Sequence, residues 1–78
     1  MNELKFEIKK NVSVLSESTK GWKREVNIIS WNERKPKLDI RDWDEEHKMM
    51  GKGITLSREE VTGLKKILLE NDIEKLLV

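Results

Sequence analysis

The sequence predicts an α+β domain in which a four-stranded antiparallel sheet is followed by one C-terminal helix (ββββα). Three observations support this fold class: apolar and polar residues alternate through the first half, short polar breaks separate the alternating runs, and helical periodicity begins after Ser57. A chain of 78 residues forms one domain at most. We assign residues 1–56 to the sheet and residues 57–78 to the helix and to dimerisation.

The first strand is predicted over residues 3–16, where apolar side chains recur at every second position. These residues of one parity are Leu4, Phe6, Ile8, Val12 and Val14. Because successive side chains of a strand point to opposite faces, we expect this parity to face the core of the domain. The polar segment 17–21, which ends in a glycine, has the composition of a turn.

Three further strands are predicted at residues 22–32, 37–43 and 51–56. Pro36 lies between the first two of these runs and belongs to a connection, because proline cannot donate a hydrogen bond to a central ladder. All connections are short, as in hairpins, so the sheet is expected to be antiparallel.

The third strand shows the clearest alternation of the four. We expect Leu38 and Ile40 to face the core, which leaves Arg41 and Trp43 on an exposed face of the sheet. Asp39 shares that second parity, and we expect its carboxylate to orient Arg41 or a neighbouring lysine.

The C-terminal helix is predicted to begin at residue 58. Ser57 and Glu60 have the spacing of a capping box, in which each side chain satisfies a free backbone N–H of the first turn. One apolar stripe of this helix consists of Val61, Leu64 and Leu68. A second stripe consists of Leu69, Ile73, Leu76 and Leu77.

One sheet face cannot cover both stripes of the helix. Either the helix kinks near Asn71 and Asp72, or the second stripe packs against another copy of the chain. We expect a homodimer, since a chain this short has a marginal core of its own. The alternative is that the last residues fray.

Composition excludes several classes of function. The chain has no cysteine and one histidine, His47, so thiolate chemistry is absent and few residues remain for a metal site or a catalytic triad. We therefore expect no enzymatic activity, no cofactor and no metal. The absence of cysteine suits the cytoplasm, and neither a secretory leader nor a membrane span is apparent.

The basic residues are concentrated in the first half of the chain. The formal net charge is +1, but residues 1–41 contain ten Lys or Arg against six Asp or Glu. Three tryptophans, Trp22, Trp31 and Trp43, lie in or beside this basic segment. Each indole either packs in the core or offers an exposed stacking surface for unpaired bases, with neighbouring cations holding phosphates.

We favour stacking for Trp43 and Trp31 because of their strand parity, whereas Trp22 can occupy either face. The candidate nucleic-acid-binding residues are Lys20, Trp22, Lys23, Arg24, Asn27, Trp31, Lys35, Lys37, Arg41, Trp43 and Lys52.

The segments Lys37–Trp43 and Gly51–Ser57, followed by a glutamate-rich helix start, resemble the transcriptional positive cofactor four family. The likeness is greatest to its small bacterial YdbC-type members and extends through Lys20–Trp22 and Ser30–Asn32. The resemblance implies a curved four-stranded antiparallel sheet with one helix, homodimers formed through the helices, and binding of single-stranded DNA across the sheet.

The resemblance also implies roles for single residues. Arg41 matches a strand arginine that contacts the DNA backbone, Lys52 matches a basic residue before the last strand, and Trp43 falls at the aromatic end of the third strand.

From the residues and the resemblance together, we expect a protein that binds single-stranded DNA, with RNA as a further candidate, and that shows little sequence preference. It would act in transcription, replication or repair, with the machinery of those processes as a partner. The alternative is a protein-interaction module that uses exposed tryptophans as hot spots.

Overall fold

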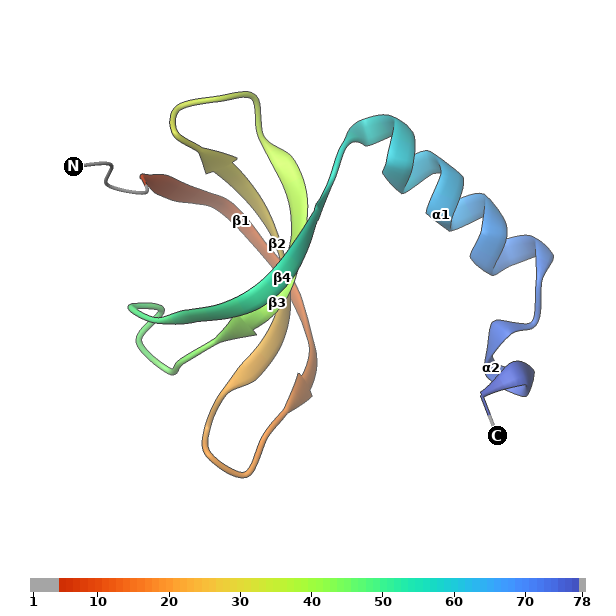
Figure 1. The fold of residues 1–78 in the computed structure, drawn as a ribbon, viewed down its shortest axis with the longest axis horizontal. Coiled ribbons are helices and arrows are strands. Elements are labelled where there is room, and N and C mark those ends of the chain that lie inside the picture. Colours follow the sequence, from red (N-terminus) through yellow and green to blue (C-terminus); the bar gives the residue numbers. More distant parts are fainter. Residues whose placement is uncertain (1–4, 78) are drawn as a thin grey trace.

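A computed structural model describes residues 5–77 of the chain. The predicted ββββα order is confirmed, and the C-terminal segment divides into two helices (Figure 1). The four strands form one antiparallel sheet in the order β1-β2-β3-β4. The elements are β1 (Phe6–Glu17), β2 (Lys23–Trp31), β3 (Lys37–Trp43), β4 (Met50–Leu56), α1 (Arg58–Glu70) and α2 (Ile73–Leu76).

The sheet is strongly curved, and its hairpin turns bend away from α1 (Figure 1). The sheet therefore has a concave face turned away from the helix and a convex face on the helix side. A groove between sheet and helix is lined by Ile28, Leu38, Leu56 and Val61, among other residues. The apolar residues of even number in β2 and β3 thus lie on the convex face.

The first strand departs most from its predicted pattern. Its pairing with β2 shifts register between Ile8 and Lys10, and again at two later points, so strict alternation is lost. Bulges of this kind bend a strand and increase its twist. Val12 and Val14 were expected in the core, but they are 48% and 45% exposed. Leu4 lies outside the described residues.

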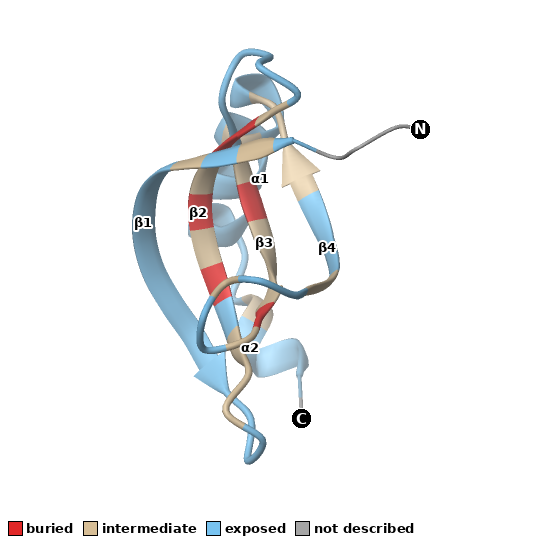
Figure 2. Cartoon of the chain, turned by 90° about the vertical axis from the view of Figure 1, so that its left-hand side faces the viewer, coloured by how far each residue is buried: buried red, intermediate tan, exposed pale blue. Residues whose placement is uncertain are grey.

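The buried residues lie at the centre of the concave side, on β2 and β3 (Figure 2). The expectation that Leu38 and Ile40 form the core was wrong, because both are only half-buried on the convex face. Their neighbours of the other parity are buried instead. The buried residues of this parity are Glu25, Asn27, Ile29, Asp39 and Trp43, and Ser30 is a further buried residue of the opposite parity.

The predicted capping box at the start of α1 is confirmed. Glu60 N donates to Ser57 Oγ at 3.2 Å, and Ser57 N donates to Glu60 Oε1 at 2.9 Å. These hydrogen bonds, the bond from the Ser57 backbone first, lower the pKa of the Glu60 carboxyl. The helix therefore starts where the sequence predicts.

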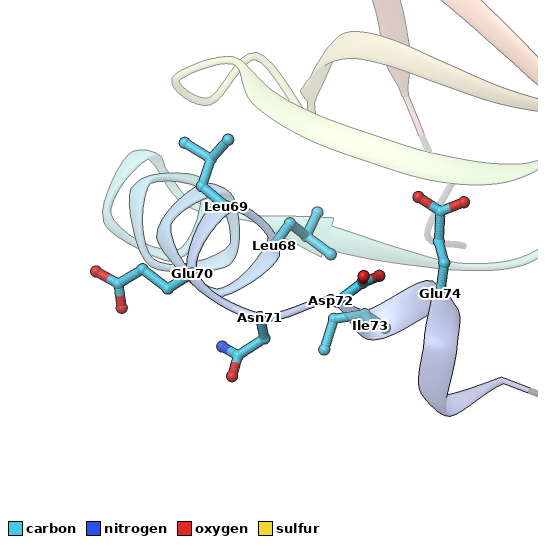
Figure 3. Close-up of a pocket in the computed structure, with 7 residues that line it drawn as sticks. All are labelled: Leu68, Leu69, Glu70, Asn71, Asp72, Ile73 and Glu74. Carbon is cyan, nitrogen blue, oxygen red and sulfur yellow. The ribbon is translucent and has the colours of Figure 1, made fainter.

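α1 ends at Glu70, and the chain is extended at Asn71 before α2 begins. The break falls where a kink was considered as an alternative. Figure 3 shows Leu68 and Ile73 on the two sides of this bend, in a recess that both helices line. Neither helix contains a buried residue, and Leu69, Leu76 and Leu77 are about three-quarters exposed.

Within residues 5–77, no helix is long and apolar enough to cross a membrane.

Candidate nucleic-acid interface

The concave face brings together the odd-numbered residues of β2 and β3. Across the two strands Glu25 pairs with Arg41, Asn27 pairs with Asp39, and Lys23 pairs with Trp43. Residues directly opposite one another in a sheet share a face, so the register alone places these side chains on one surface. Figure 2 views the sheet from this side.

An aromatic cluster crosses this face. The Phe6 ring lies between the Trp31 ring, at 5.7 Å between centroids, and the Trp43 ring, at 5.3 Å. His47 packs on Trp43 with a centroid distance of 5.5 Å. All three pairs are tilted, a geometry that aromatic rings favour over direct face-to-face stacking.

Trp43 was predicted to be exposed, and this was wrong. Its side chain is on the predicted face, together with Arg41, but its exposure is 0%. Phe6 and His47 pack against its ring, whereas Trp31 remains half-buried and in contact with solvent. In this structure Trp31, and not Trp43, is therefore the indole of the concave face that a ligand can reach.

The loop between β3 and β4 explains the burial of Trp43. Asp44 Oδ1 accepts hydrogen bonds from Lys48 N at 2.8 Å and from Met49 N at 2.9 Å, which fold the loop back on itself. His47 adopts a positive φ of 57° at the tip. Its Nε2 lies 2.9 Å from both carboxylate oxygens of Glu25 on β2, so the loop is tied across the concave face.

Glu25 is a buried hydrogen-bonding centre. Besides His47, its Oε1 accepts from Asn11 Nδ2 at 3.2 Å and from Asn27 Nδ2 at 3.1 Å. A buried carboxylate needs several such donors to offset the loss of water. Asn27, a predicted binding residue, is fully buried and supports Glu25 instead of offering a contact surface.

Arg41 lies at the centre of the face in a closely fitting site. Its Nε donates to Asp39 Oδ1 at 2.6 Å and its Nη2 donates to Asp39 Oδ2 at 2.8 Å, which confirms that Asp39 orients this arginine. The guanidinium carbon lies 4.8 Å from the centroid of the Trp31 ring. The guanidinium therefore lies over one face of the indole, where the cation is attracted to the π-system.

Two of the predicted binding residues lie away from this surface. Arg24 pairs with Asp42 on the convex side, Nε to Oδ1 at 3.0 Å, and Asp42 raises the Arg24 pKa further through a hydrogen bond and through its charge. The Trp22 ring lies against Gly51, beside Asp42. Both side chains are therefore separated from Trp31 by the sheet.

The remaining predicted cations lie at the ends and edge of the sheet. Lys23 is half-buried at the start of β2, and within residues 5–77 none of these lysines forms an ion pair. These lysines lie around a face whose centre contains two buried carboxylates, Glu25 and Asp39. The exposed members are Lys20 in the β1–β2 turn, Lys35 in the β2–β3 connection, Lys37 at the start of β3 and Lys52 on β4.

Sequence reasoning missed two features of this face. Phe6 was assigned to the core, but it connects the two tryptophans on the concave side. His47 was considered only as the one histidine of the sequence and was given no structural role, yet it contacts Glu25 and Trp43. No local sequence pattern indicates the contact with Glu25, because His47 and Glu25 are 22 residues apart along the chain. Among the described residues, no three His, Asp or Glu side chains gather in an arrangement suited to a metal ion.

Comparison with known proteins provides the family context. The family model described as Transcriptional Coactivator p15 (PC4) matches residues 18–67, from the β1–β2 turn into α1. An uncharacterized protein of Treponema pallidum (strain Nichols) is 42% identical over 67 residues, which cover 86% of this chain and 79% of that relative.

Proposed function

The chain belongs to the PC4 family of transcriptional coactivators, and from this premise we propose that it binds single-stranded DNA on the concave face of its sheet. The family match covers β2, β3 and β4, which contribute most of that face. The narrower likeness to the YdbC-type members stays a prediction.

The observation that carries the proposal is the pairing of Trp31 with Arg41 at the centre of the concave face. Base stacking on an aromatic side chain contributes about 1 to 3 kcal/mol per base and tolerates any sequence, because every base has a π-face. The exposed lysines at the ends and edge of the sheet then supply phosphate contacts. Their contribution to affinity should weaken with salt, since each such contact releases counterions from the strand.

A protein of this kind favours melted DNA by mass action alone. If it binds unpaired strands and not the duplex, each binding event shifts the equilibrium toward the open form. No energy source and no catalytic residue are needed. The processes in which such an activity would serve are transcription, replication and repair, each of which exposes single strands.

The proposed binding unit is a homodimer formed through the helices. In a single chain, apolar side chains of α1, of α2 and of the residue after α2 are between 51% and 76% exposed; they are Ile67, Leu68, Leu69, Leu76 and Leu77. Apolar surface of this extent on adjoining turns is typical of an interface. A second copy would cover it and add a second concave face.

The competing function, a protein-interaction module with exposed tryptophans as hot spots, has less support. Trp43 is buried, and Trp22 and Trp31 are only half-buried. A hot spot needs an indole free to enter a pocket of the partner.

Tryptophan fluorescence can test the proposal. The emission should be quenched by oligo-dT, and the apparent affinity should fall steeply as salt is raised. RNA and duplex DNA of equal length are the comparison ligands, and the duplex should bind much more weakly than either single strand. Equal affinity for duplex and single-stranded DNA would contradict the proposal, as would indifference to all three ligands.

A further inference from the structure

We propose that Asp39 is a positioning residue for single-strand binding: it holds the Arg41 guanidinium over the Trp31 ring, so that the arginine contacts a base and not a phosphate. This inference rests on the proposed function and differs from the backbone contact that the family resemblance implies for Arg41. It is carried by the geometry around the guanidinium group.

The first part of that geometry is the carboxylate. Asp39 is fully buried and accepts two hydrogen bonds from Arg41, at 2.6 Å and 2.8 Å, in a bidentate pair. Thr55 Oγ1 on β4 donates to Asp39 Oδ2 at 2.9 Å. Two neighbouring strands therefore fix the carboxylate, and the planar pair fixes the plane of the guanidinium.

The second part is the space around Arg41. Gly53 pairs with Arg41 across β3 and β4, and a side chain at Gly53 would collide with the Arg41 side chain and the Ile40 carbonyl. Met50 Sδ lies 3.5 Å from Nη1 on another side. The Trp31 ring, whose centroid is 4.8 Å from the guanidinium carbon, also limits the space in which the guanidinium can turn.

The charge of Arg41 is also already paired with the carboxylate of Asp39. The side chains of Arg41 and Asp39 are 14% and 0% exposed, so the ion pair is largely desolvated. Moving the guanidinium to a phosphate would leave a buried carboxylate without its main partner, which is costly. The exposed lysines can meet phosphates without such a cost.

Arg41 nevertheless keeps donors for a ligand. A guanidinium has more N–H groups than the three hydrogen bonds found here use, so Nη1 and Nη2 each retain one N–H. Base edges present carbonyl oxygens and ring nitrogens as acceptors. A base that packs beside the Trp31–Arg41 pair would thus meet free guanidinium donors at a fixed position.

Substitution of Arg41 by lysine distinguishes the two roles. Lysine keeps the charge but cannot form a bidentate pair or a flat stack, so Arg41→Lys should weaken oligo-dT binding as much as Arg41→Ala, on the order of tenfold. Neither change should alter the slope of log affinity against log salt. Lys52→Ala is the matched control, because loss of a phosphate contact should make that slope shallower.

Asp39→Asn tests the positioning role directly. It should weaken binding about as much as Arg41→Ala, and the double variant should be no weaker than either single variant, because both remove one unit. The Arg41 Nε–H signal in NMR spectra should be protected from exchange in the parent and lose that protection in Asp39→Asn. If Asp39→Asn fails to fold, Thr55→Val makes the same test by a milder change. It should cause a partial loss of both oligo-dT binding and Nε–H protection.

The inference is overturned if Arg41→Lys binds like the parent while Arg41→Ala gives a shallower salt slope, since Arg41 would then be a phosphate contact. The inference is also overturned if the binding losses are additive, that is, if a double variant of Arg41→Ala with Asp39→Asn, or with Thr55→Val, loses the sum of the two single-variant losses. A parent protein that does not bind oligo-dT at all would instead contradict the proposed function itself.

Discussion

At the scale of single residues, Trp31 and Trp43 show how two tryptophans on one face can have different roles. Both contact the Phe6 ring, but only Trp43 is also covered by His47 and fully buried. Trp31 has Arg41 on its ring and remains partly open to solvent. We interpret Trp43 as the packing centre of the concave face and Trp31 as its stacking surface.

Alanine substitutions should separate these roles. Trp43→Ala should lower the free energy of unfolding by about 3 to 5 kcal/mol, as truncation of a buried aromatic residue does. Trp31→Ala should cost about 1 to 3 kcal/mol of binding to oligo-dT with a smaller loss of stability. Urea unfolding and a binding titration on both variants provide the two quantities.

Trp43→Phe is the control, because it keeps a ring between Phe6 and His47 and should retain most of the stability. If Trp43→Ala were as stable as the parent, the packing role would be wrong. If Trp31→Ala bound like the parent, stacking on that indole would be excluded.

Strand parity in the sequence was enough to predict that Trp43 and Arg41 share a face of the sheet. The ion pair of Asp39 with Arg41 could also be predicted, because the two residues have the same parity and opposite charges. The burial of Trp43 could not be predicted from the sequence, because it depends on the β3–β4 loop, which folds back across the sheet to Glu25. Contacts of this kind are set by tertiary structure and leave no local pattern in the sequence.

At the scale of elements, the start of α1 could be predicted because its cap is local. Ser57 and Glu60 satisfy backbone N–H groups within one turn, so the four residues 57–60 contain the whole signal. β1 could be predicted as a strand, but not its three register shifts, which depend on pairing with β2. The assignment of Val12 and Val14 to the core failed for this reason.

Ser57→Ala should lower the free energy of unfolding by about 1 kcal/mol, the usual cost of losing a helix cap. Part of this contribution depends on pH. The pKa of Glu60 is lowered in the folded state, so its stabilisation is present above the ordinary carboxyl pKa and is lost as the pH falls through the lowered folded-state value.

Urea midpoints near neutral pH measure the cost of Ser57→Ala. Ser57→Ala keeps the backbone N–H that donates to Glu60 Oε1, so the pH dependence is checked with a second pair, Glu60→Ala and the parent, near neutral pH and in acid. The difference between the two proteins should shrink in acid. Glu59→Gln is the comparison, since it changes a neighbouring carboxylate and leaves both hydrogen bonds of the box in place. A difference that stayed constant with pH would show that Glu60 does not act through the cap.

At the scale of the whole molecule, the main feature is the separation of two surfaces. The concave face contains the aromatic cluster and the Arg41 site, while the helices on the convex side expose apolar side chains (Figures 1 and 2). The second apolar stripe could be recognised from its spacing in the sequence. What covers it could not, because a partner lies outside the chain.

The homodimer stays a prediction that substitution in α2 can test. Changing both Ile73 and Leu76 to Asp should yield monomers or unfolded protein, because charges would be placed in the proposed interface. Lys75→Asp changes the charge of the same helix at an exposed site and should leave the dimer intact. Sedimentation equilibrium measures the mass, and a folded dimer of the double variant would contradict an interface formed by α2.

The central claim, that unpaired DNA lies on the concave face, is tested most directly by the indole N–H signals of the three tryptophans in NMR spectra during titration with oligo-dT. We predict the largest shift for Trp31, which is accessible beside Arg41, and a smaller one for Trp22, which lies next to Gly51 on the other side of the sheet. Backbone signals of Arg41 and Gly53 should move with Trp31. Shifts confined to Trp22 and to the helices, with Trp31 unchanged, would contradict the account.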